Sequence, residues 1–314
     1  MTFPVAGVHL PVWLPPLVAF VIGALCAPAG VTGAFLLLPL QVSLLGFTAP
    51  AVTPTNFLYN VVGIPGGVLR YGREGRLDWT LAGALAAGLV PGSFLGMLVH
   101  LFWLTDTRRF KLYVAAVLLL LAVRLALAVR AGGSPARPAD GAGEGEGDPT
   151  PARGTRSQPA GARVVIERRS WRSVSARLGD TRYAYDPLAM TGMGLLMGAV
   201  GGAYGIGGGA MMAPLLLSVC RLPVHAIAGA NLAGTLAASV AGVFFYAVIG
   251  PLLAGPGTAV APDWALGLLF GVGGLLGLYC GASLQRFLPA RGIKAGLAIL
   301  LLLLVLYYGW DVLG

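Results

Sequence analysis

Residues 198–231 read GAVGGAYGIGGGAMMAPLLLSVCRLPVHAIAGAN, and this stretch decides the fold. It is apolar enough to lie in a lipid bilayer, yet four of the five residues from Gly205 to Gly209 are glycine. A glycine in a helix interior costs roughly 1 kcal/mol relative to alanine. We therefore expect a helix that breaks at these glycines instead of one straight span.

The same pattern occurs earlier in the chain, at a constant offset of 175 in the numbering. Without a gap, Gly23, Ala24, Gly30, Gly33, Pro39, Ser43, Ala51 and Asn56 match Gly198, Ala199, Gly205, Gly208, Pro214, Ser218, Ala226 and Asn231. Two interrupted hydrophobic segments at corresponding places in two halves indicate the binding site of a secondary transporter. The sequence therefore predicts a secondary transporter for a small anion.

The composition indicates a polytopic membrane protein. The 314 residues are 57% hydrophobic and 11% charged, with a mean hydropathy of +0.81, whereas soluble domains carry about 25% charged residues. Much of the net charge of +9 comes from arginines in one polar stretch, which favours contact with an anionic leaflet over contact with nucleic acid. Three scattered cysteines form neither a disulfide framework nor a metal-binding spacing, and we expect no cofactor.

Two transmembrane repeats are expected, residues 1–130 and 186–314, with a linker at 131–185 between them. The apolar run 12–45 would be about 50 Å long as one helix, against a hydrocarbon core of about 30 Å, so it must fold back as a hairpin. We expect an all-α fold of two inverted repeats, each a broken helical hairpin plus three spans, about ten helices in total. In the first repeat the spans are expected at 50–69, 79–103 and 112–129.

The linker divides into two parts by composition. Residues 131–163 are rich in Gly, Pro, Ala and Glu, which predicts disorder. In 164–185, Trp171, Val174 and Leu178 would share one helical face among arginines, so the segment is either a basic helix on an anionic leaflet or a solvated linker. Because this linker is the most basic segment, we expect it to be cytoplasmic.

Matching residues also mark the start of a later span in each half. Asp78-Trp79 and Asp263-Trp264 match at an offset of 185, and in each pair the Asp is expected to cap a helix and the Trp to lie at the membrane interface. At the same offset, rows of glycines predict close helix contacts. These rows are Gly88, Gly92 and Gly96, and Gly273, Gly277 and Gly281.

The candidate site is formed by the two helix breaks. Half-helices that start at Gly33 and Gly208 would point their N-termini, each with about half a positive charge and free N–H donors, at the middle of the membrane. The candidate substrate-binding residues are Gly30, Thr32, Gly33, Asn56, Tyr204, Gly205, Gly207, Gly208, Gly209 and Asn231, followed by Cys26, Thr53 and Thr55. The alternative is that the glycines only allow tight packing and the asparagines only link helices.

The acidic residues all fall in expected loops, interfaces or the linker. Proton relays and sodium sites usually have a carboxylate inside the membrane, so this absence weakens a carboxylate-based antiport mechanism. It leaves open the coordination of an ion by backbone groups. No HExxH or GxSxG motif is present, and we do not expect an enzyme.

The glycine run from Gly201 to Gly209 with Pro214, the Ala230-Asn231 pair and the two Asp-Trp starts resemble the sulfite exporter TauE/SafE family. The resemblance covers both halves outside the linker. It implies a multi-pass permease of the bacterial inner membrane for sulfite or organosulfonates such as sulfoacetate. The first half departs from the pattern, because Cys26-Ala27-Pro28 and Thr32 stand where the second half has glycines or small residues.

Three functions follow as hypotheses. The first is export of sulfite or a small organosulfonate by alternating access, with the anion held at the two glycine breaks. The second is ion-coupled uptake of a related sulfur oxyanion, and the third is a membrane scaffold without transport. The expected partners are a small sulfur-containing anion and membrane lipid, with a homodimer left open and no nucleic acid.

Overall fold

The computed structural model describes residues 1–26, 32–43, 45–47, 50–130, 163–220, 222–255, 258–284, 299 and 301–307. The first half contains a two-stranded ribbon and six helices: β1 (Thr2–Phe3), β2 (Val8–His9), α1 (Leu14–Cys26), α2 (Ala34–Ser43), α3 (Val52–Gly63), α4 (Pro65–Arg73), α5 (Trp79–Trp103) and α6 (Thr107–Arg130). The remaining elements are β3 (Val164–Arg169), β4 (Val174–Leu178), β5 (Thr181–Tyr185), α7 (Pro187–Tyr204), α8 (Gly209–Ser218), α9 (Val224–Phe244), the π-helix η2 (Phe245–Ile249), α10 (Gly250–Leu253) and α11 (Trp264–Leu284).

Aspartates start three of the long helices. Asp78 Oδ1 accepts hydrogen bonds from the backbone N–H groups of Thr80 and Leu81 at 3.0 and 2.9 Å, and Asp186 caps α7 in the same way. Asp263 Oδ1 accepts from Leu266 N–H at 3.1 Å. Each carboxylate satisfies donors that have no partner inside the helix and complements the positive end of its dipole. Both predicted Asp caps are therefore confirmed, and the placing of Trp79 and Trp264 at the membrane interface stays a prediction.

The span predicted at 50–69 is in fact two helices. α3 ends at Gly63 and α4 starts at Pro65. Proline has no N–H to donate and favours the first position of a helix, so Pro65 ends one helix and begins the next. α6 also begins earlier than predicted, at Thr107.

Of the two alternatives for 164–185, a basic helix or a solvated linker, the helix is wrong: β3, β4 and β5 form an antiparallel sheet in that order. The residues Val174, Ala176 and Leu178 are buried while their neighbours are not, and this period of two is that of a strand. Gly179, with φ +59°, and the following residue turn β4 into β5. Of the segment predicted to be disordered, 131–163, all but Arg163 lies outside the described residues.

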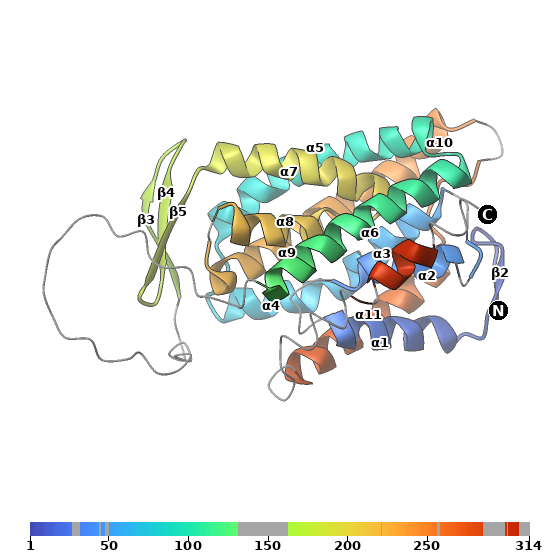
Figure 1. Ribbon diagram of the computed structural model, residues 1–314, viewed down its shortest axis with the longest axis horizontal. Helices are drawn as coiled ribbons and strands as arrows, with labels where there is room; N and C mark the ends of the chain where they lie inside the picture. Colours follow the sequence, from blue (N-terminus) through green and yellow to red (C-terminus); the bar gives the residue numbers. More distant parts are fainter. Residues whose placement is uncertain are drawn as a thin grey trace, which may run out of the picture.

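The sheet is attached to the helices at the start of α5. Tyr183 and Tyr185 each donate a hydroxyl hydrogen bond to the buried carboxylate of Asp78, at 3.1 Å to Oδ2. The segment predicted to be a linker thus includes a folded element that packs on the membrane-type helices (Figure 1).

Two pairs of helices pack along their length, α5 with α7 and α1 with α11. A Cβ added at Gly88 or Gly92 would overlap the backbone of α7, at Thr191 and Leu195. In the other pair, a Cβ at Gly273 or Gly277 would overlap the backbone of α1 at Pro16 and Phe20. Gly88, Gly92, Gly273 and Gly277 of the predicted glycine rows are therefore at helix contacts, while the surroundings of Gly281 are not described.

The residues in contact within one helix pair correspond to those in contact within the other pair, at the two offsets found in the sequence, 175 and 185. Thr191 and Leu195 correspond to Pro16 and Phe20 at the offset of 175. Gly273 and Gly277 correspond to Gly88 and Gly92 at the offset of 185. The α5–α7 pair thus repeats the α1–α11 pair residue by residue.

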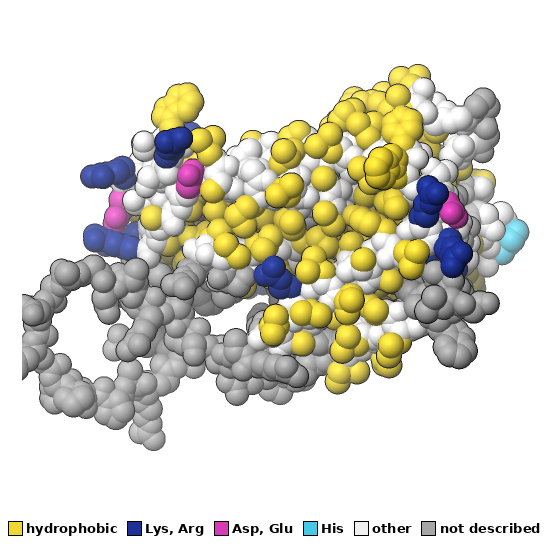
Figure 2. Space-filling model, turned by 45° about the horizontal axis from the view of Figure 1, so that its top comes forward, with side chains coloured by type: hydrophobic (Ala, Val, Ile, Leu, Met, Phe, Trp, Pro, Cys, Tyr) yellow, Lys and Arg dark blue, Asp and Glu magenta, His cyan; other side chains and the backbone are white. Residues whose placement is uncertain are grey.

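The exterior between the two ends of the molecule is apolar. The segments Trp79–Trp103 and Ile227–Leu253 are long and apolar enough to cross a membrane, and Leu14–Cys26, Ala34–Ser43 and Trp264–Cys280 are shorter apolar helices. On the face in Figure 2, hydrophobic side chains cover the middle, and charged side chains gather at the two ends apart from one Lys or Arg. This distribution is that of a membrane protein.

Candidate functional site: two helix breaks that share an asparagine

The break between α7 and α8 depends on glycine. Gly205, Gly207 and Gly208 have φ values of +85°, +69° and +76°, a left-handed conformation that costs other residues roughly 1–2 kcal/mol. Space is also lacking, since a Cβ at Gly205 would lie 2.6 Å from the backbone oxygen of Thr53. The predicted interruption is present, with α7 ending at Tyr204 and α8 starting at Gly209.

In the first half the described residues Thr32 and Gly33 are not helical and α2 begins at Ala34, while residues 27–31, which follow the described part of α1, lie outside the described residues. The Gly33 carbonyl accepts from the N–H groups of residues 36 and 37, as the Gly208 carbonyl does from those of 211 and 212. A Cβ at Gly33 would lie 2.7 Å from the Tyr59 hydroxyl. The predicted site residue Gly30 lies outside the described residues.

Asn56 of α3 joins the two breaks. Its Nδ2 donates to the Ala34 carbonyl at 2.9 Å and to the Gly205 carbonyl at 3.1 Å. Tyr204, the last residue of α7, donates its hydroxyl to the Phe35 carbonyl at 2.9 Å. The start of α2 and the end of α7 are therefore in direct contact inside the protein.

Asn231 of α9 has the equivalent position at the second break. Its Nδ2 donates to the Gly209 carbonyl at 3.0 Å. Gly209 is the first residue of α8 as Ala34 is of α2, and in each case the asparagine follows 22 residues later. Both asparagines thus make the helix-linking bond of the alternative interpretation, and neither Oδ1 atom has a hydrogen-bond partner in the described part of the chain.

Three polar residues at this site were missed by the sequence analysis: Asn60, Thr235 and Ser239. Asn60 Nδ2 donates to the Ile206 carbonyl at 3.4 Å, and Thr235 Oγ1 donates to the Asn231 carbonyl at 2.7 Å. Ser239 Oγ lies 2.8 Å from where a Cβ of Gly207 would be. The offset of 175 that pairs Asn56 with Asn231 also pairs Asn60 with Thr235, and this signal would have found two of them.

Of the other predicted site residues, some lie beside the breaks and one does not. Thr53 Oγ1 donates to the Ala203 carbonyl at 3.3 Å, at the end of α7, and Thr32 is buried beside Gly33. Cys26 is a buried free cysteine at the end of α1. Thr55 is not part of the breaks, because its hydroxyl donates to the Ala51 carbonyl and accepts from Asp263 N–H.

The site is buried and contains no described ionic group. Asn56, Asn60, Ser239 and Tyr204 are 0% exposed and Asn231 is 7% exposed. Among the described residues the buried carboxylates are Asp78 and Asp263, and both cap helix starts. The polarity of the site therefore comes from amides, hydroxyls and the buried start of α8, whose first N–H groups have no side-chain cap.

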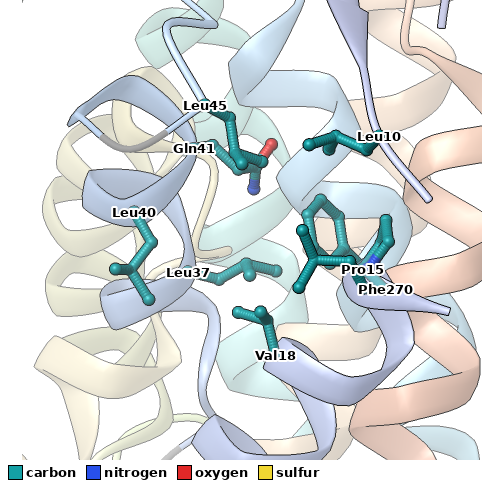
Figure 3. A pocket seen from close by; sticks show the side chains of 9 residues that line it. Leu10, Pro15, Val18, Leu37, Leu40, Gln41, Leu45 and Phe270 are labelled. Atoms are coloured by element: carbon teal, nitrogen blue, oxygen red, sulfur yellow. The ribbon is translucent and has the colours of Figure 1, made fainter. Parts of the chain in front are cut away.

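A small cavity lies along α2, about 40 Å³ in volume. It is lined by apolar residues of α1, α2 and α11 and by the side chain of Gln41. Figure 3 shows the Gln41 amide pointing into it, and neither amide atom of this buried residue has a hydrogen-bond partner among the described residues. The cavity has room for a water molecule beside this amide.

Apolar helices around a buried, polar helix break define an integral membrane protein of the transporter class. The model of the sulfite exporter TauE/SafE family matches residues 16–308. Since this match spans nearly the whole chain, the protein belongs to the sulfite exporter TauE/SafE family, whose members are membrane transporters of sulfur anions. A search among curated proteins finds no match, and neither does a search among solved structures.

Proposed function

We propose that the protein exports sulfite or a small organosulfonate, with the anion bound where the α1–α2 and α7–α8 breaks meet. The observation that carries this proposal is Asn56, which bonds the first residue of α2 and the first residue after α7. It joins the N-terminus of α2 to Gly205, the start of the turn that leads into the N-terminus of α8, and the positive ends of two helix dipoles near one place would favour a negative ligand.

The donors for the anion are backbone N–H groups. At the start of α8 the residues Gly208, Gly209 and Ala210 are buried, and no side chain caps them. Glycine lets an oxyanion approach these N–H groups closely. The unwound backbone of a transporter hairpin is tolerated at membrane depth only when protein or a ligand satisfies it, which supports this as the binding place.

We infer further that the two halves form an inverted repeat that works by alternating access. Asp78 at the start of α5 contacts Tyr185 just before α7, so these two helices begin at one end of the molecule. Asp263 at the start of α11 accepts a hydrogen bond from Ala6 N–H, in the β1–β2 turn that precedes α1. In Figure 1, α5 and α7 run opposite to α1 and α11. Opposed directions with matched contacts support the inversion.

The direction proposed is outward, across a bacterial inner membrane. Each negative charge that leaves a cell interior at −100 mV gains about 2.3 kcal/mol, so a dianion gains about 4.6 kcal/mol. We place the sheet and the adjoining linker on the cytoplasmic side, because the sheet carries exposed arginines such as Arg168, Arg172 and Arg182. Export of a dianion then needs no other energy source.

Sulfite flux in proteoliposomes tests the proposal. The purified protein is reconstituted into vesicles loaded with sulfite, and its release is compared with that from protein-free vesicles and from vesicles containing a Gly208→Val variant. We expect release by the wild-type protein alone. If no sulfur oxyanion moves or binds, the substrate is wrong even though the fold stands.

A further inference from the structure

We propose that the α7–α8 break also binds a monovalent cation, Na⁺, next to the anion. The ligands are the side-chain oxygens of Asn56, Asn60, Asn231 and Ser239. The placing of the anion rests on the function proposed above, but the cation site rests on separate observations about these four side chains.

The first observation is the orientation of the three asparagine amides. Each one directs its Nδ2 at a backbone carbonyl beside the break: Asn56 at Gly205, Asn60 at Ile206 and Asn231 at Gly209. A carbonyl oxygen only accepts hydrogen bonds, so the nitrogen of each amide must face it. The orientation is therefore fixed, and Oδ1 is the free atom in all three.

The second observation is that these oxygens have no partner. Asn56 Oδ1, Asn60 Oδ1, Asn231 Oδ1 and Ser239 Oγ are buried and form no hydrogen bond with the described residues. All four side chains border the same short segment, 205–209, through the bonds to its carbonyls or the contact with Gly207. Buried acceptors without a donor are rare in folded proteins and call for an explanation.

The chemistry of the free atoms selects the ligand. Amide oxygens carry partial negative charge, so they repel an oxyanion and attract a cation or a hydrogen-bond donor. Several neutral oxygens around one place suit a hard cation. The absence of a carboxylate among the described residues of the break favours one positive charge over two. In other transporters the oxygens of unwound helix segments coordinate Na⁺ through backbone carbonyls; here the proposed oxygens belong to side chains that border such a segment.

The two proposed ligands would stabilise each other. A single ion buried without a partner is strongly unfavourable, whereas a buried ion pair with satisfied oxygens and N–H groups is tolerated. The anion at the start of α8 and the cation at the asparagine oxygens would both border one short segment, 205–209. By linkage, Na⁺ must then raise the affinity for the anion by the same factor as the anion raises that for Na⁺.

Thermal unfolding of the purified protein in detergent tests the site. The midpoint is measured in sodium, potassium and choline chloride at equal ionic strength, each with and without sulfite. We expect a rise that saturates with Na⁺ and is absent in choline, because a ligand that binds only the folded state stabilises it. We also expect sulfite to lower the Na⁺ concentration needed.

Ser239→Ala is the diagnostic variant, since Ser239 Oγ has no partner to lose among the described residues. Its unfolding midpoint in choline should equal that of the wild type. Its Na⁺ affinity should fall at least about tenfold, as happens when residues around other bound metal ions are replaced. Ser93→Ala is the matched control, a fully buried helical serine whose Oγ donates to the Val90 carbonyl at 2.7 Å. It should leave the Na⁺ affinity unchanged.

The outcomes separate the two proposals. A Na⁺-specific rise without any effect of sulfite supports the cation site and refutes the substrate. Sulfite binding that is equal in sodium and choline refutes the cation site and leaves the substrate intact. A stabilisation that follows pH and not Na⁺ would show that the oxygens accept from a protonated ligand, which also overturns the cation site, as would an unchanged Na⁺ affinity in Ser239→Ala.

Discussion

At the scale of single residues, the left-handed glycines decide whether the break can form. In Gly208→Ala, the new Cβ would lie 2.6 Å from Leu89 Cδ2 and 2.8 Å from the Met197 carbonyl, and φ +76° costs an L-residue about 1–2 kcal/mol. We expect a lower unfolding midpoint and loss of sulfite flux. Gly192→Ala in α7 is the control, because its Cβ meets nothing within 4 Å and should stabilise the helix by up to about 1 kcal/mol. Normal flux in Gly208→Ala would argue against a site at this break.

The two matched asparagines should differ in their contribution to stability. Asn56→Ala leaves the carbonyls of Ala34 and Gly205 without their side-chain donor, whereas Asn231→Ala affects only the carbonyl of Gly209. Each buried group left unpaired costs about 1–3 kcal/mol. Unfolding of the two variants in a mixed-micelle denaturant series should therefore show the larger loss for Asn56→Ala. Equal losses would mean that one of its two bonds contributes nothing.

At the scale of helices and strands, the glycine rows set how closely neighbours approach. A side chain in Gly92→Val would overlap the backbone of α7 at Leu195, so α5 and α7 must separate along their contact. We expect a large fall in the unfolding midpoint and poor folding yield. Gly83→Val, also in α5, has open space at its Cβ and should leave the midpoint unchanged or slightly raised, because valine has a somewhat higher helix propensity than glycine. Similar falls in both variants would disprove the packing role.

The attachment of the sheet should weaken in alkali. Burial, and next the charge of Asp78, raise the pKa values of Tyr183 and Tyr185. A group with a raised pKa contributes stability that is full below its ordinary pKa, about 10 for tyrosine, and that is lost as the pH rises further. Limited proteolysis of the sheet should accelerate above about pH 10. The double variant Tyr183→Phe and Tyr185→Phe should lose this pH dependence; if it persists, other groups cause it.

Local signals in the sequence predicted where helices begin, break and pack closely, but they did not predict which residues far apart in the chain contact each other. The breaks, the Asp caps and the glycine rows were predicted because each depends on the backbone conformation or size of the residues themselves. The sheet was missed because Trp171, Val174 and Leu178 fit a helical face, while the buried series Val174, Ala176 and Leu178 fits a strand. The partners of Asn56 lie 22 and 149 residues away, and no local pattern reports such distances along the chain.

At the scale of the whole molecule, the net charge moved across the membrane in each transport cycle shows whether the anion crosses alone or together with Na⁺. With Na⁺ equal on both sides and sulfite present as the dianion, co-transport of one Na⁺ moves one net negative charge, worth about 2.3 kcal/mol per 100 mV. The steady-state sulfite ratio across the vesicle membrane should then change about fortyfold per 100 mV. A dianion alone would give more than about a thousandfold. A potassium diffusion potential with valinomycin sets the voltage, and a ratio independent of voltage would contradict charge movement.

Asn56 imposes a mechanical condition on any such cycle. Its amide donates one hydrogen bond to the carbonyl of the first residue of α2, in the N-terminal half, and one to that of the first residue after α7, in the C-terminal half. If one half slides past the other, at least one of these two hydrogen bonds must break. Water or the transported anion must then bind the group that has lost its partner. Asn60 and Tyr204 also form hydrogen bonds between the two halves, so the rate at which this group of bonds breaks would set an upper limit on the turnover of such a cycle.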